Sequence, residues 1–128
     1  MIPRLLALDV GTRRTGTAFF DPKTDIIVPL DTIVHENEET LALRIAALVH
    51  ERSIEAVVLG LPLLLSGDEG SQARIVRELG SMLIKNNMHV AYVDERYTTQ
   101  KGGENDGDAR AACAILTIYC EQNGYLTN

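Results

Sequence analysis

The chain has no apolar stretch that approaches the roughly 20 residues a membrane-spanning helix requires. Its first four residues also lack the basic region, apolar core and small-residue cleavage site of a signal peptide. Both absences argue against export or membrane insertion. We therefore expect a cytoplasmic protein that does not act at a membrane.

Cysteine and histidine are also scarce. Cys113 and Cys120 lie seven positions apart in an expected helix, which separates them by two turns, too far for a strain-free disulfide. His35, His50 and His89 are scattered, and no Cys-x-x-Cys pair occurs, so nothing indicates a zinc site. We expect reduced, buried thiols.

The chain lacks a surplus of basic residues. Twelve Lys and Arg against 18 Asp and Glu give a net charge of −6, whereas general nucleic-acid binders are usually basic. An enzyme that collects cations at an acidic site and contacts phosphates through a few local arginines remains compatible with this charge. A length of 128 residues fits one domain, spanning 1–128.

Apolar periodicity and turn residues predict five strands and three helices. The expected strands are 5–8, 15–20, 26–34, 56–59 and 90–93, and the expected helices are 38–52, 71–86 and 108–122. Pro29 inside the third strand suggests a sheet edge or a bulge. The order βββαβαβα implies three antiparallel strands followed by right-handed parallel crossovers. We expect an α/β fold with one mixed sheet flanked by helices.

Each expected helix has an apolar stripe at helical spacing, which predicts the face turned toward the sheet. The predicted inner residues are Leu41, Ile45, Leu48 and Val49 in the first helix, Ile75, Leu79, Met82 and Leu83 in the second, and Ala112, Ile115, Leu116 and Tyr119 in the third.

Three acidic residues fall at comparable places in this order. Asp9 ends the first strand before the turn at Gly11, Glu95 follows the fifth strand, and Asp108 opens the last helix. In open α/β sheets, ligands bind beyond the carboxyl ends of the parallel strands, and carboxylates suit Mg²⁺ or Mn²⁺. Taken singly, each acid has an ordinary alternative as a turn residue, a solvated turn or a helix cap. Their combination with the strand order favours a metal site.

Five segments in register resemble the YqgF family, also called RuvX, of bacterial RNase H-like nucleases. The segments are residues 8–16 (LDVGTRRTG), 60–63 (GLPL), 67–73 (GDEGSQA), 94–99 (DERYTT) and 108–116 (DARAACAIL). The family comprises Holliday junction resolvases and pre-16S rRNA nucleases. The resemblance implies an RNase H-like sheet and a metal-dependent endonuclease that acts on structured RNA or branched DNA.

The resemblance also implies roles for particular residues. Asp9, Glu95 and Asp108 would form the catalytic, metal-binding triad for Mg²⁺ or Mn²⁺, with Asp106 as a competing third acid at a less suitable interval. The expected nucleic-acid contacts are Arg13, Arg14 and Arg96, whose guanidinium groups can grip phosphate, and Gln72, which opens a helix after a glycine-rich loop. Arg13 and Arg14 are equally compatible with a plain exposed turn. We expect a monomer or a weak homodimer.

One departure from the family pattern bears on activity. The family usually has a further helical stretch and a basic approach to the last acid, but residues 100–107 are short, glycine-rich and net acidic. This weakens the expected grip on substrate. It supports an alternative hypothesis, a non-catalytic module that docks RNA or a ribosome-assembly partner. A sugar-kinase or actin-like ATPase is a third possibility, but such proteins need two domains of this kind and a longer chain.

Overall fold

The computed structural model describes residues 1–97 and 107–126. The elements in order are β1 (Leu5–Asp9), β2 (Arg14–Asp21), β3 (Ile26–Val34), α1 (Glu38–Arg52), β4 (Ala56–Leu61), α2 (Ser71–Lys85), β5 (Val90–Asp94), a 3₁₀ turn η1 (Glu95–Tyr97) and α3 (Gly107–Asn123). The predicted order βββαβαβα is confirmed. The predicted loop 100–107 and the competing acid Asp106 lie outside the described residues, apart from Gly107, the first residue of α3.

The strands form one sheet in the order β3-β2-β1-β4-β5. β1 pairs antiparallel with β2, and β2 pairs antiparallel with β3, whereas β4 runs parallel to both β1 and β5. β3 is an edge strand, which explains how it accommodates Pro29, a residue that cannot donate to a neighbouring strand. The mixed sheet predicted from the sequence is therefore present.

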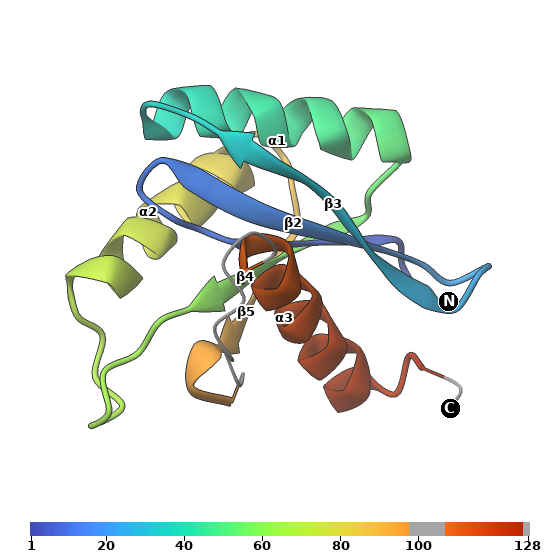
Figure 1. Cartoon of the computed structure of the whole chain (residues 1–128). Helices are drawn as coiled ribbons and strands as arrows, with labels where there is room; N and C mark the ends of the chain where they lie inside the picture. The colour runs from blue at the N-terminus through green and yellow to red at the C-terminus, as the bar shows by residue number, and fades with distance from the viewer. Residues whose placement is uncertain (98–106, 127–128) are drawn as a thin grey trace.

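Helices cover both faces of the sheet (Figure 1): α1 and α2 lie on one face and α3 on the other. Alternate residues of β1 separate the two cores, as strand geometry requires. Leu6 and Leu8 pack toward α1 and α2, whereas Leu5 and Ala7 pack toward α3. Because β1 is buried on both faces, its sequence is apolar without alternation.

Three of the four predicted inner residues of the second helix face the core: Leu79 and Leu83 are fully buried, and Met82 is partly buried. The fourth, Ile75, is 38% exposed, and the buried face also includes Ala73, Val76 and Gly80, which were not predicted. Small residues carry little hydrophobic signal, but they let α2 approach the sheet closely. A methyl group on Gly80 would collide with the Tyr92 hydroxyl of β5. The prediction of Ile75 as an inner residue is wrong.

The other predicted inner faces are closer to the structure. In α1, Leu41 and Ile45 are buried, while Leu48 and Val49 are partly buried. In α3, the inner face holds the predicted Ala112, Ile115 and Leu116 together with Ala111 and Cys120, and Tyr119 is partly buried.

The two cysteines are free thiols, as predicted. Cys120 is fully buried in the core beneath α3, and Cys113 is partly buried on the same helix. Burial raises the pKa of both thiols, that of Cys120 to about 11. In the part of the chain that the structure describes, no helix has the length and apolarity needed to cross a bilayer.

Candidate functional site

Asp9 lies at the carboxyl end of β1, at the centre of the sheet. Its neighbour on one side is Gly16 of β2, and the parallel pairing of Leu8 with Leu59 places Gly60 of β4 next on the other side. The chain then turns at Gly11, where an added methyl group would overlap the carbonyl oxygen of Arg14. The turn therefore requires glycine, and it begins two residues after the carboxylate.

Glu95 reaches the same end of the sheet from β5. Glu95 is the first residue of the 3₁₀ turn that follows β5. Val93, two residues earlier, pairs with Gly60 of β4, so Glu95 leaves the sheet close to Gly60. A methyl group on Gly60 would lie 2.5 Å from Glu95 Oε1 and 2.9 Å from its Cγ. The bare backbone of β4 thus leaves the space through which the Glu95 side chain crosses toward Asp9.

The two carboxyl groups meet in a poorly solvated place. Burial raises the pKa of Glu95 to about 8, and both a side-chain hydrogen bond with Asp9 and the negative charge of Asp9 act in the same direction. A hydrogen bond between two carboxyl groups requires a proton, since two carboxylates can only accept. Near neutral pH the pair therefore holds one proton and about one negative charge in place of two.

The predicted third acid is located only by its backbone. Asp108 is the second residue of α3, and the disposition of its carboxyl group is outside the described structure. The same helix approaches this place further along, because a methyl group on Gly60 would overlap the Ile115 side chain as well as Glu95 Oε1. Among the described residues, no group of three His, Cys, Asp or Glu side chains converges. The triad of Asp9, Glu95 and Asp108 stays a prediction.

The predicted phosphate contacts divide into two groups. Arg13 and Arg14 are exposed at the turn that follows Asp9. Arg96 is held instead by the protein: its guanidinium makes a two-pronged contact with Asp94, with Nη2 2.8 Å from Oδ2, and Nη1 donates to the Leu65 carbonyl at 3.4 Å. The structure thus gives Arg96 a role in fixing the loop between β4 and α2.

That loop, residues 62–70, is a short hairpin tied to the protein at both ends. Leu63 pairs with Glu69, and the Glu69 carboxylate binds Arg77 of α2 at 2.6 Å. The Arg77 guanidinium in turn stacks on the Tyr92 ring at 4.4 Å. The hairpin presents Leu65 almost fully exposed at its tip. Gln72 follows on the exposed side of the first turn of α2.

A buried polar pair beside Asp9 was missed from the sequence. Thr15 and His35 are 0% and 5% exposed, and Thr15 Oγ1 lies 2.8 Å from His35 Nε2. Thr15 also accepts a 3.4 Å hydrogen bond from the backbone of Gly11, so the pair ties the turn to the end of β3. Lone polar residues flanked by apolar strand residues are the signal that could have identified them.

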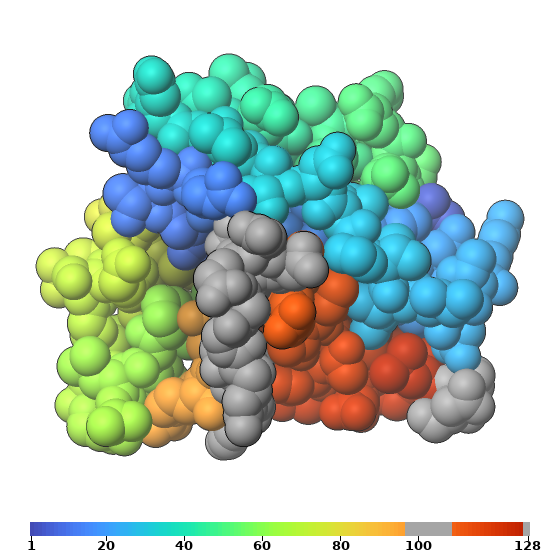
Figure 2. Space-filling view, in the orientation of Figure 1, coloured from blue at the N-terminus to red at the C-terminus, as the bar shows by residue number. Residues whose placement is uncertain are grey.

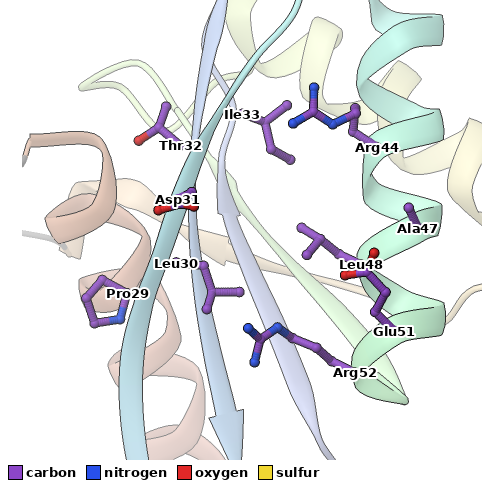
Figure 3. A pocket seen from close by; sticks show the side chains of 10 residues that line it. All are labelled: Pro29, Leu30, Asp31, Thr32, Ile33, Arg44, Ala47, Leu48, Glu51 and Arg52. Carbon is purple, nitrogen blue, oxygen red and sulfur yellow. The ribbon is translucent and has the colours of Figure 1, made fainter.

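A separate recess lies between β3 and α1 (Figure 3). It has a volume of about 460 Å³. Arg44 and Arg52 extend into it from α1 toward the sheet edge, and Glu51 lies beside Leu48. Neither Asp9 nor Glu95 lines this recess, so it is separate from the carboxylate pair.

The chain is similar to known proteins over most of its length. Residues 3–122 match the family RuvX, described as Holliday junction resolvase. A protein of Sulfurihydrogenibium sp. (strain YO3AOP1) named "Putative pre-16S rRNA nuclease" is 38% identical, with 93% of this chain and 90% of the relative covered. A protein of the same name from Lactococcus lactis subsp. cremoris (strain MG1363) is 42% identical, with 94% and 96% covered.

Solved structures show the same fold at low identity. RuvC of Thermus thermophilus superimposes with a TM-score of 0.64 at 10% identity, over 95% of this chain and 97% of RuvC. The fowlpox virus Holliday junction resolvase gives 0.58 at 10% identity, over 94% and 99%. The expected RNase H-like architecture is confirmed, and the extent of the sequence match settles the relationship: the chain belongs to the RuvX family.

Proposed function

We propose that the chain is a metal-dependent endonuclease that processes pre-16S rRNA, with branched DNA as a second class of substrate. The observation that carries the proposal is the Asp9–Glu95 carboxyl pair at the carboxyl end of the parallel strands. The names of the relatives at about 40% identity favour the RNA substrate. The cytoplasm is the location in which such a substrate is made.

The pair has the chemistry of a site for Mg²⁺ or Mn²⁺. Both donors are hard carboxylate oxygens, and they are close enough to share a hydrogen bond in a place where two negative charges are disfavoured. Asp9, Glu95 and Asp108 would hold the ion, which supplies Lewis acidity for the hydrolysis of a phosphodiester. Here Asp9 and Glu95 would provide carboxylate ligands once the shared proton is lost, and the missing side chain of Gly60 leaves the space that Glu95 occupies.

Residues around the Asp9–Glu95 pair would bind the substrate. Arg13 and Arg14 are exposed on the turn that starts just after Asp9, where they would contact the phosphate backbone of a bound substrate. Gln72 lies at the start of α2, on the same side as that turn. Arg96 acts through the loop that it fixes, and a phosphate contact from it requires the Asp94 contact to rearrange. A monomer provides all of these groups.

The deciding experiment measures cleavage of a precursor 16S rRNA fragment and of a four-way DNA junction with Mg²⁺ or Mn²⁺. Asp9→Asn and Glu95→Gln each keep the shape and remove a carboxyl group that could bind the metal ion, and we expect both to abolish cutting. Glu121→Gln makes the same chemical change on an exposed residue near the far end of α3 and should cut normally. RNA binding without any metal-dependent cleavage would replace this proposal with the non-catalytic binding module.

A further inference from the structure

A small cavity lies at the same end of the sheet as the carboxyl pair, but on the opposite face, the one that α1 and α2 cover. It has a volume of about 200 Å³ and is bounded by the β1–β2 turn, the segment that enters α1, and α2. We call it the turn pocket and define it by Gly11, His35, Glu38, Leu41, Gln72 and Val76. Figure 2 shows the turn (blue) projecting next to the entry to α1 (teal), with the start of α2 (yellow) below them. The lining starts at Val10, one residue after Asp9.

The deep walls of the turn pocket are apolar. Leu41, Val76 and Leu79 are at most 2% exposed and come from two different helices. The volume corresponds to about seven water molecules at the density of the liquid. It is below the range of drug-sized ligand sites, so the pocket fits one flat ring system and excludes a complete nucleotide.

One buried polar atom on the lining has no hydrogen-bond partner. His35 is 5% exposed, Thr15 engages its Nε2, and its Nδ1 is left without a hydrogen bond. The backbone of Asn37 is near enough to favour the protonated ring, but burial has the larger effect and lowers the pKa of His35. The neutral ring then offers one donor or one acceptor at Nδ1. Buried polar atoms are nearly always paired in native proteins, so a water molecule or a bound ligand is expected to pair with this nitrogen.

The polar groups at the mouth select against anions. Glu38, in the first turn of α1, is half-buried, and Glu39 and Glu78 lie close enough for their charges to add to burial in raising the pKa of Glu38. A phosphate would be repelled there. The Glu38 carboxylate accepts hydrogen bonds and the Gln72 amide both donates and accepts, which suits a neutral ring that carries N–H groups.

We propose that the turn pocket binds one unpaired nucleobase that bears an amino group. This deepens the proposed function and rests on it for the class of substrate, a nucleic acid. Carboxylates accept hydrogen bonds from base amino groups, and enzymes acting on nucleic acid commonly hold an unstacked base in a fitted pocket. Uracil lacks an amino group, so guanine, cytosine and adenine are preferred to it.

The test measures binding, so it does not depend on catalysis. Fluorescent single-stranded oligouridylates carrying guanine, cytosine, adenine or uracil at one central position are titrated with the full chain without divalent metal. We expect the three amino bases to bind roughly 5- to 100-fold more tightly than uracil, the range for a good polar contact to a base edge. Glu38→Gln should remove most of this preference. Glu39→Gln, the adjacent exposed carboxylate, should preserve it.

A second variant fills the pocket. Ile75 lines it and is already 38% exposed, so Ile75→Phe can add bulk without disturbing the core. It should weaken the base preference while the thermal unfolding curve stays that of the native protein. Equal affinity for all four bases, or a preference that survives both Glu38→Gln and Ile75→Phe, overturns the pocket assignment. Base-selective binding by a protein that cuts nothing would refute the nuclease proposal and leave the pocket intact.

Discussion

The glycine beneath Glu95 provides the sharpest test of how the carboxyl pair is built. In Gly60→Ala, the new methyl group would lie 2.5 Å from Glu95 Oε1 and would also overlap the Ile115 side chain. Ile115 is fully buried, so it has little room to move. Overpacking of this kind lowers the free energy of unfolding by about 1–3 kcal/mol. Replacing glycine by alanine in a strand raises it by about 0.5–1 kcal/mol, because the unfolded chain loses conformational freedom. The net cost of about 0–2.5 kcal/mol predicts a fall in Tm of up to roughly 12 °C for a chain of this size.

The same change should affect function more than stability. Glu95 can escape the methyl group only by moving away from β4, which separates it from Asp9. Thermal unfolding and metal-dependent cleavage are measured on the same samples, at a temperature where the variant is still folded. We expect cleavage to fall by at least about tenfold, since small misplacements of catalytic groups can cost up to about a hundredfold.

A matched control separates the two effects. Gly80→Ala also inserts a methyl group into a tight contact, but against the Tyr92 hydroxyl on the α2 face of the sheet. It should change stability without reducing cleavage at a temperature where it is folded. If Gly60→Ala keeps both the native Tm and native cleavage, then Glu95 does not depend on the gap at β4, and the geometry assigned to the pair is wrong.

Three further outcomes follow from the described structure. The folded-state pKa of Glu95, about 8, lies above its unfolded value of 4.5, so its contribution to metal-free stability is complete below pH 4.5 and is lost as the pH rises through 8. Denaturant unfolding should show a loss on the order of 2 kcal/mol after allowance for solvent screening, and Glu95→Gln should flatten it. A thiol reagent should modify the partly buried Cys113 well before Cys120. Arg77→Ala should cost about 1 kcal/mol or less, because the Glu69 pair is exposed, but should speed amide exchange in loop 62–70.

The sequence predicted the fold well because β1, β4 and the helices carry strong local signals. β1 is apolar throughout because helices cover both sides of it, and turns or caps bound the other elements. The error at Ile75 has a physical cause. A periodicity argument gives weight to large apolar residues, whereas α2 approaches the sheet through Ala73 and Gly80. Close packing of small residues can be recognised only when the opposing strand is known.

The candidate site was less predictable than the fold. Asp9 and Glu95 could be identified because strand ends at one edge of a sheet are implied by topology. Gly60 could not, because sequence spacing does not reveal which side chain crosses a neighbouring strand. The ion pair of Arg96 with Asp94 was missed for a similar reason. The motif indicates that an arginine is present, but the partner of its guanidinium depends on the 3₁₀ turn that follows β5.

The carboxyl pair also explains how an acidic protein can act on a polyanion. With a net charge of −6, the chain has little general attraction for nucleic acid, and the charge of Asp9 and Glu95 opposes the approach of a phosphate to the site. A divalent ion bound there reverses the sign of the local field, so the ion and the substrate should each strengthen the binding of the other. Arg13 and Arg14 then need only orient the backbone. By this reasoning, substrate binding as well as bond cleavage would depend on the metal ion.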